Sequence, residues 1–261
     1  MVDLLFQAFI PFILSAFIVI LIIFIAERYG TKIGGIFGTL PSTIVIAFIF
    51  ISLNKGVDFA SLSVAVVPAE LGINLIFLFF FSLFAQRSIF EAFILSFTVW
   101  IILSSMLFIF NITNIFVSLA IFFISLLLTF TFLECFKKIP SIGNVMVHYT
   151  SKKIAFRGIL AGLVISISVM LSNIGEVISG IFSVFPAILS STMLIATHEH
   201  GPEFAAGMAK SMILGISSVM CYATTIHFLY PLYGILWGSV YAYGFSLFVT
   251  LILFKLRSKI S

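Results

Sequence analysis

Nine long apolar segments divide this chain of 261 residues and leave little room for any fold other than a membrane-spanning one. Each is about as long as the twenty helical residues that cross ~30 Å of hydrocarbon. Only 8% of the residues are charged, against about 25% in soluble domains. The segments lack the alternation with a period of two that strands of a barrel would show. We therefore predict an all-α polytopic membrane protein whose spans cover roughly residues 5–27, 33–53, 60–85, 89–110, 113–135, 155–172, 175–197, 204–228 and 230–254.

The basic residues predict the orientation of these spans in the lipid bilayer. With the N-terminus outside, eleven Lys and Arg side chains fall on the cytoplasmic side, Lys55 falls outside, and Lys210 lies within a span. This bias is typical of an inner or plasma membrane protein, here with a cytoplasmic C-terminus. The basic residues flank spans and form no soluble patch, so the net charge of +4 does not indicate a nucleic-acid partner. The eleven are Arg28, Lys32, Arg87, Lys137, Lys138, Lys152, Lys153, Arg157, Lys255, Arg257 and Lys259.

An internal duplication organises the chain. Residues 30–60 recur at 175–205 with a constant offset of 145 and no gap. That offset contains five spans, an odd number, so the second copy enters the membrane in the opposite direction and the two form an inverted-topology repeat. We expect repeat 1 over 1–110, a connecting span and basic cytoplasmic linker over 111–153, and repeat 2 over 154–261. The residues that recur identically are Gly30, Ile33, Gly35, Ile36, Phe37, Pro41, Gly56, Phe59 and Ala60.

Each copy carries small residues followed by a proline. Gly35 and Pro41 in the first copy correspond to Gly180 and Pro186 in the second. A proline frees a carbonyl group one turn back in a helix. Interrupted helices at matching positions of two inverted halves are the sequence pattern that indicates a transporter's binding site. We therefore predict that these four residues border a substrate site; the alternative is a tightly packed pair of kinked helices.

Polar residues inside the predicted spans extend this site. Glu70 lies about 16 Å from the outer surface, near mid-membrane, where an ionisable residue is a functional candidate. Asn74 follows one turn later on the same face. Lys210 lies ~10 Å deep in the equivalent span of the second copy. We predict a Glu70–Lys210 pair, or a site in which substrate or proton competes for one of them; the alternatives are a structural ion pair and a lysine that reaches the cytoplasm.

A cluster of metal-ligand residue types marks the predicted cytoplasmic turn after residue 197. His198, His200 and Glu203 could hold a divalent metal if the turn is extended. Glu203 could instead cap the following helix, and the histidines could form a pH-sensitive gate. Neither histidine recurs in the first copy, so neither belongs to the shared architecture.

The stretch Ala26-Glu27-Arg28-Tyr29-Gly30, followed by Gly34-Gly35-Ile36-Phe37-Gly38-Thr39-Leu40-Pro41, resembles small GlpM-like proteins of the bacterial inner membrane. In those proteins a Gly-Gly-x-x-x-x-x-Pro run follows a first span that ends in an acidic–basic pair. The resemblance covers about the first eighty residues and, more weakly, the second copy. It implies a membrane location and a fold, not a substrate. This chain departs from the pattern by carrying two fused copies.

The features together predict a secondary transporter or permease that moves a small solute or ion through a midplane site between inverted repeats. A second hypothesis is a membrane scaffold or accessory factor that does not transport. A third is a divalent metal transporter or sensor. No sequence motif of an enzyme is present, and no cofactor is expected. The sequence leaves a homo-oligomer open.

Overall fold

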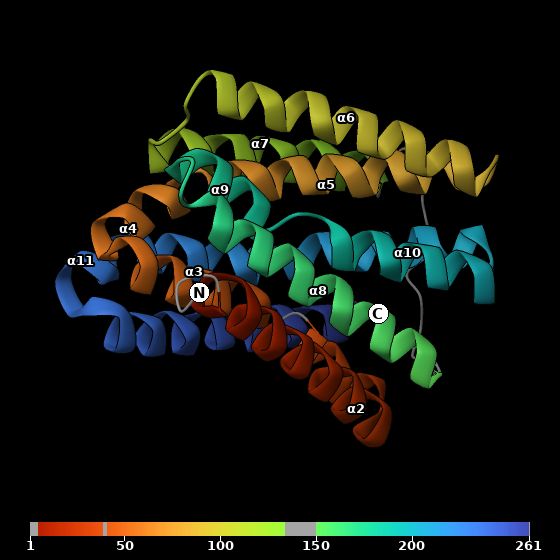
Figure 1. The fold of residues 1–261 in the computed structure, drawn as a ribbon. Coiled ribbons are helices and arrows are strands. Elements are labelled where there is room, and N and C mark those ends of the chain that lie inside the picture. Colours follow the sequence, from red (N-terminus) through yellow and green to blue (C-terminus); the bar gives the residue numbers. More distant parts are fainter. Residues whose placement is uncertain (1–4, 39–40, 134–149, 261) are drawn as a thin grey trace.

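The computed structural model describes residues 5–38, 41–133 and 150–260, and this part of the chain is helical without a strand. A short π-helical turn, η1 (Leu5–Phe9), leads into a bundle of α-helices that run roughly along one common direction (Figure 1). The helices are α2 (Ile10–Gly38), α3 (Ser42–Lys55), α4 (Val57–Ala65), α5 (Val67–Phe84), α6 (Ile89–Ile109), α7 (Ile115–Thr131), α8 (Ser151–Leu171), α9 (Glu176–Ser183), α10 (Ala187–His200) and α11 (Pro202–Ile260).

Several helices are suited to cross a bilayer. Among the described residues, six stretches are long and apolar enough to do so, and α3 and α7 are shorter apolar helices. Large apolar side chains such as Phe116 and Leu232 are exposed on the outer surface, where lipid would cover them. The protein is therefore an all-α, multi-pass membrane protein. The six stretches are Phe6–Phe24, Val57–Phe84, Ile89–Ile109, Ser151–Leu171, Glu176–His200 and Pro202–Ile252.

Several helix boundaries differ from the predicted ones; the span predicted over 60–85, for example, is divided at Val66 into α4 and α5. Helix α2 continues to Gly38 through the turn predicted near residue 30, because a single glycine weakens a helix without breaking it. In the second copy the equivalent helix is interrupted between Leu171 and Glu176. Helix α11 consists of two helices that meet at Gly234, whose φ of 69° and ψ of −174° are not helical. This break lies after Pro231, a few residues beyond the predicted boundary at 229.

Helix α5 forms the centre of the bundle. It packs against α4, α6, α7 and α11, and every residue from Val67 to Leu75 is buried. This position keeps the polar residues Glu70 and Asn74 away from lipid, where they would be costly. Helix α6 turns one face towards the interior and exposes the other, including Ile101 and Ile109. Its buried residues recur every three or four positions, as one helical face does: Ala92, Ser96, Trp100, Ser104 and Leu107.

Single glycines connect two pairs of helices. Gly56 joins α3 to α4 with φ 91° and ψ 165°, and Gly201 joins α10 to α11 with φ 86° and ψ 170°. A side chain is strained at such positive φ values, so glycine suits both turns. Helices α3 and α10 each contain 14 residues. The two connections, 145 residues apart in the sequence, thus have nearly the same backbone geometry.

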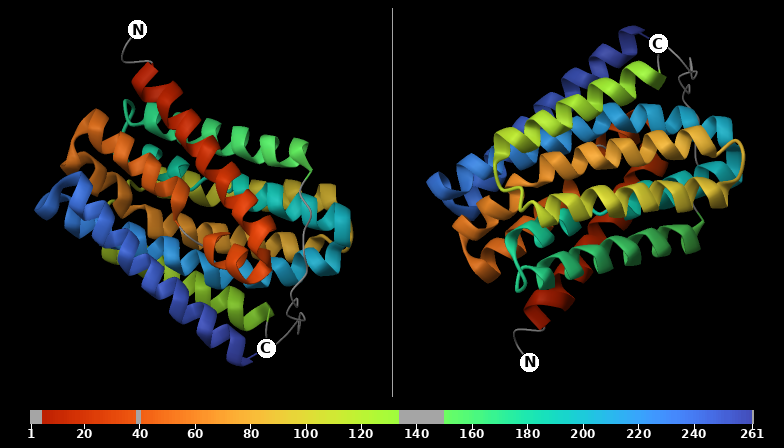
Figure 2. Two further views of the ribbon diagram at one scale, coloured as in Figure 1. Left: turned by 90° about the horizontal axis from the view of Figure 1, so that it is seen from below. Right: turned by 90° about the horizontal axis from the view of Figure 1, so that it is seen from above.

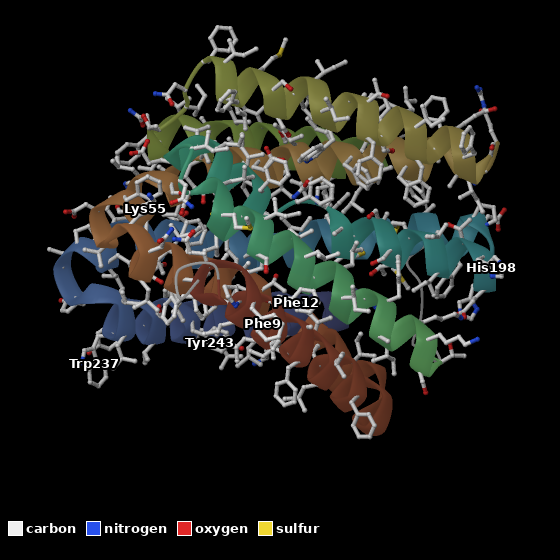
Figure 3. The ribbon with its side chains drawn as sticks, viewed as in Figure 1. Phe9, Phe12, Lys55, His198, Trp237 and Tyr243 are labelled. Carbon is white, nitrogen blue, oxygen red and sulfur yellow. The ribbon has the colours of Figure 1, made fainter. Side chains whose placement is uncertain are left out.

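The two ends of the bundle carry different residues. Lys55 and His198 lie at opposite ends (Figure 3). Next to Lys55, Asn54 accepts a hydrogen bond from Gln7 (2.7 Å) and donates one to Ser172 (2.9 Å). Helices α2 and α8 pack against each other, and the left view of Figure 2 shows α2 crossing the bundle beside α8. The first and second copies are therefore in direct contact at the Lys55 end.

Candidate functional site

The chain leaves helical geometry at both prolines singled out in the sequence. Pro41 (φ −77°, ψ 45°) precedes α3, and Pro186 (φ −74°, ψ 33°) precedes α10. A proline has no N–H to donate, and its ring disfavours a helical conformation in the residue before it. Helix α9 accordingly ends at Ser183, and a new helix starts at Ala187. Both interruptions therefore follow from the proline chemistry.

Both breaks border one cavity of about 180 Å³. Five parts of the chain line it: the start of α3, α5, α8, the segment between α9 and α10 with the start of α10, and α11. Its walls are mainly apolar, with hydroxyl and amide groups at Ser42, Thr43, Asn74 and Ser183. The lining residues are Pro41, Ser42, Thr43, Ile44, Leu71, Asn74, Ala161, Val164, Ile165, Ser183, Val184, Phe185, Ala187, Ile188, Leu189, Met212, Gly215, Ile216 and Val219.

Asn74 links this cavity to the interrupted backbone. Its side chain is 1% exposed, and its Nδ2 donates a 2.7 Å hydrogen bond to the carbonyl oxygen of Val184, between α9 and α10. The side-chain oxygen Oδ1 is buried and has no hydrogen-bond partner within the described structure. An unpaired buried acceptor costs free energy. Asn74 is thus held in place from one side while its other polar atom is left unpaired.

Glu70 lies one turn before Asn74 on α5 and is completely buried. Ser104 of α6 donates a 2.9 Å hydrogen bond to Glu70 Oε1, while Oε2 has no partner in the described structure. Trp100 precedes Ser104 by one turn and packs edge-on against Phe185, a cavity residue, at 4.9 Å between ring centroids. Glu70 does not line the cavity itself. Glu70 is connected to the cavity by its own helix, α5, and by the α6 side chains that face Glu70.

Glu70 and Lys210 do not form the predicted ion pair in the described structure. The hydrogen bond to the Glu70 carboxylate comes from Ser104, and Lys210 is half-buried in α11, outside the cavity lining. Ser104 and Trp100 are functional candidates that sequence reasoning missed. Their spacing of four residues, shared with Ser96, is the signal that could have placed them on the face of α6 that meets α5.

The predicted site residue Gly180 does not line the cavity. A Cβ atom built on Gly180 would lie 2.1 Å from the carbonyl oxygen of Ser63 in α4. Gly180 therefore allows α9 to approach α4 closely, which is a packing role rather than substrate contact. Gly35 lies within α2, and the surroundings of this position are outside the described residues. Pro186 is flanked by the lining residues Phe185 and Ala187.

The predicted metal site is wrong in its geometry. The described residues contain no group of three or more His, Cys, Asp or Glu side chains that could hold a metal ion. Helix α10 extends to His200, so His198 and His200 lie about 200° apart around it instead of pointing the same way. The His200 ring packs against Phe204, 4.5 Å between centroids. Glu203 is exposed in the first turn of α11.

Glu199, between the two histidines, forms an ion pair with Lys153 at the start of α8. The two side chains are 21% and 31% exposed, and partly exposed pairs contribute little. We expect Glu199→Gln to lower the free energy of unfolding in detergent by less than about 1 kcal/mol. The doubly exchanged variant, Lys153→Glu with Glu199→Lys, should restore it. A loss above about 3 kcal/mol would mean that the pair is structurally essential.

Comparisons with protein-family models, with curated proteins and with solved structures find no match to this chain. The resemblance to GlpM-like proteins therefore stays a prediction, and the site must be interpreted from its own geometry.

Proposed function

We propose that the protein is a secondary transporter or permease that carries a small solute or ion through the cavity between its two copies. The observation that supports this most is that two proline breaks, 145 residues apart, border the same cavity. In secondary transporters built from inverted repeats, substrates bind where interrupted helices leave backbone groups unpaired. The buried, half-satisfied Asn74 adds a side-chain group to that backbone.

We further propose that the two copies form an inverted repeat with nine spans, counting the two halves of α11 separately. The equal lengths of α3 and α10 and the matching turns at Gly56 and Gly201 support this arrangement. Helices α2 and α9 also end at equivalent positions, Gly38 and Ser183. With the N-terminus outside and the C-terminus in the cytoplasm, residues 1–110 and 154–261 would be the two rocking units.

Glu70 is our candidate for the coupling residue. Ionisable residues buried within membrane spans commonly relay protons. Its carboxyl group lies one turn from Asn74 and contacts the α6 face that also touches the cavity residue Phe185. A change in its protonation would therefore act on helices that border the substrate.

Alternating access can be tested without knowing the substrate. Both cysteines, Cys135 and Cys221, would first be replaced by serine. We expect a Ser183→Cys variant to react with a membrane-impermeant maleimide added to either face of sealed vesicles, because Ser183 lines the cavity. The readout is the labelled fraction over time.

Ser118→Cys provides the matched control. Ser118 is completely buried in α7 and does not line the cavity, so this variant should remain unlabelled from both faces. If Ser183→Cys is also unlabelled from both faces, the interior is sealed and the scaffold hypothesis is favoured. Labelling from one face under every condition would contradict rocking between two open states.

A further inference from the structure

Two helix starts face the cavity together. The first three residues of α3, Ser42 to Ile44, and the first three of α10, Ala187 to Leu189, all line it. The N–H groups of a first helical turn have no partner within the helix. Neither start has a side chain that accepts from these groups. The N–H of Ala187 donates to the carbonyl oxygen of Phe185 (2.7 Å). The N–H groups of Ser42 to Ile44, Ile188 and Leu189 have no partner among the described residues, so the cavity has unpaired backbone donors on two sides.

These helix starts also contribute a positive potential to the cavity. Among the described residues, the lining contains no Asp, Glu, Lys, Arg or His. Each helix N-terminus acts as roughly half a positive elementary charge, so two of them provide about one. Helix α9 ends at the same cavity, but its last carbonyls are occupied: Gly180, Ile181 and Phe182 accept from the Ser183 hydroxyl and from the N–H groups of Val184 and Phe185. The two helix starts therefore favour a ligand with one negative charge.

Asn74 is a second, independent indication of a ligand. Its amide orientation is fixed, since Nδ2 donates to the Val184 carbonyl and a flipped amide would place two acceptors together. Oδ1 is therefore an acceptor without a donor, in a side chain that is 1% exposed and lines the cavity. A ligand with a hydroxyl or similar donor would satisfy it.

The remaining walls limit the rest of the ligand. Leu71, Ile165, Met212 and Ile216 are apolar and fit a short hydrocarbon part. The volume of about 180 Å³ is below the ~300–1,000 Å³ of pockets for drug-sized molecules. A dianion would leave one charge uncompensated among apolar side chains, which is costly.

We propose that the cavity binds a small aliphatic monocarboxylate with a hydrogen-bond donor beside the carboxylate, as in a 2-hydroxy acid. The carboxylate would lie between the starts of α3 and α10, the donor at Asn74 Oδ1, and the short chain against α8 and α11. This inference names the substrate class and rests on the proposed transport function.

Binding is tested first, separately from transport. L-lactate at millimolar concentration should slow maleimide labelling of the Ser183→Cys variant by about tenfold at saturation. Glycerol, which is neutral, and succinate, which is a dianion, should not slow it. Protection by glycerol or succinate equal to that by L-lactate would overturn the proposed substrate class, and so would labelling that L-lactate leaves unchanged.

Uptake by proteoliposomes then separates the two proposals. We expect the wild-type protein to accumulate radiolabelled L-lactate faster than succinate or glycerol by about tenfold or more. If both faces of the Ser183→Cys variant are labelled but L-lactate neither protects nor enters, transport stands and the substrate class fails. If L-lactate protects but does not enter, the anion site stands and transport fails.

Variants of Asn74 test the assigned atoms. Asn74→Asp places a carboxylate beside the ligand, so it should abolish L-lactate protection, with at least a tenfold weaker apparent affinity. Asn74→Ala should reduce the preference for L-lactate over propionate, which lacks the hydroxyl, while propionate still protects. Elution as a single symmetric peak in size-exclusion chromatography reports whether each variant folds. An Asn74→Ala variant that keeps the full preference for L-lactate would contradict the assignment of Asn74.

Discussion

Replacing Glu70 with glutamine should abolish the stimulation of L-lactate uptake by an inward-directed proton gradient. The amide has nearly the same size and can still accept the hydrogen bond from Ser104, but it cannot take up or release a proton. We expect the gradient-driven initial rate to fall about tenfold or more, equivalent to ~1.4 kcal/mol or more in the barrier. Exchange of L-lactate across the membrane without a gradient should persist. Radiolabel uptake at matched and unmatched internal pH measures both.

The control for this experiment is Glu91→Gln. Glu91 is an exposed carboxylate in the first turn of α6, so its replacement removes the same chemical group from a neighbouring helix without altering the interior. This variant should retain the response to the gradient. If Glu70→Gln responds like the wild type, Glu70 is not the coupling residue. A variant inactive in both exchange and gradient-driven uptake would instead indicate that Glu70 is needed to assemble the site.

The largest effect on stability is expected from Gly180→Ala. A Cβ at this position would lie 2.1 Å from the Ser63 carbonyl oxygen and 2.6 Å from Val66 Cγ1. The first of these atoms is backbone and cannot move aside cheaply, so α9 and α4 must separate. Overpacking usually costs about 1–3 kcal/mol, and a backbone clash should reach or exceed the upper value. Unfolding in mixed micelles with increasing dodecyl sulfate measures the loss.

Gly244→Ala is the matched substitution. Gly244 is exposed in the second half of α11, and a Cβ built there meets nothing within 4 Å. Alanine should be neutral or stabilise the helix by up to ~1 kcal/mol, its advantage in helix propensity. Equal stability of Gly180→Ala and Gly244→Ala would show that α9 and α4 are not as close as the structure places them.

Some of the site could be predicted from the sequence because its causes are local. Pro41 and Pro186 interrupt a helix wherever they occur in its interior. Glu70 and Asn74 share a helical face because of their spacing.

Other features depend on tertiary packing or on small differences in free energy. Helix α2 continues past residue 30 because a helix tolerates a glycine at this position. The same residues could also form a turn, and the sequence does not distinguish between the two. The partner of Glu70 could not be inferred, because it depends on how α6 is rotated against α5. The metal prediction failed because it assumed an extended turn, whereas α10 remains helical to His200 and only Gly201 reverses the chain.

The charge that the cavity offers comes from peptide groups at the starts of α3 and α10 rather than from side chains. Peptide dipoles do not titrate, so the attraction of these helix starts for a carboxylate would not itself depend on pH, whereas the ionisation of the nearby Glu70 would. The same property makes selectivity resistant to point mutation, since no single side-chain exchange removes a backbone N–H except substitution by proline. Evolution could then alter the apolar walls, and with them the preferred chain length, without losing affinity for the carboxylate.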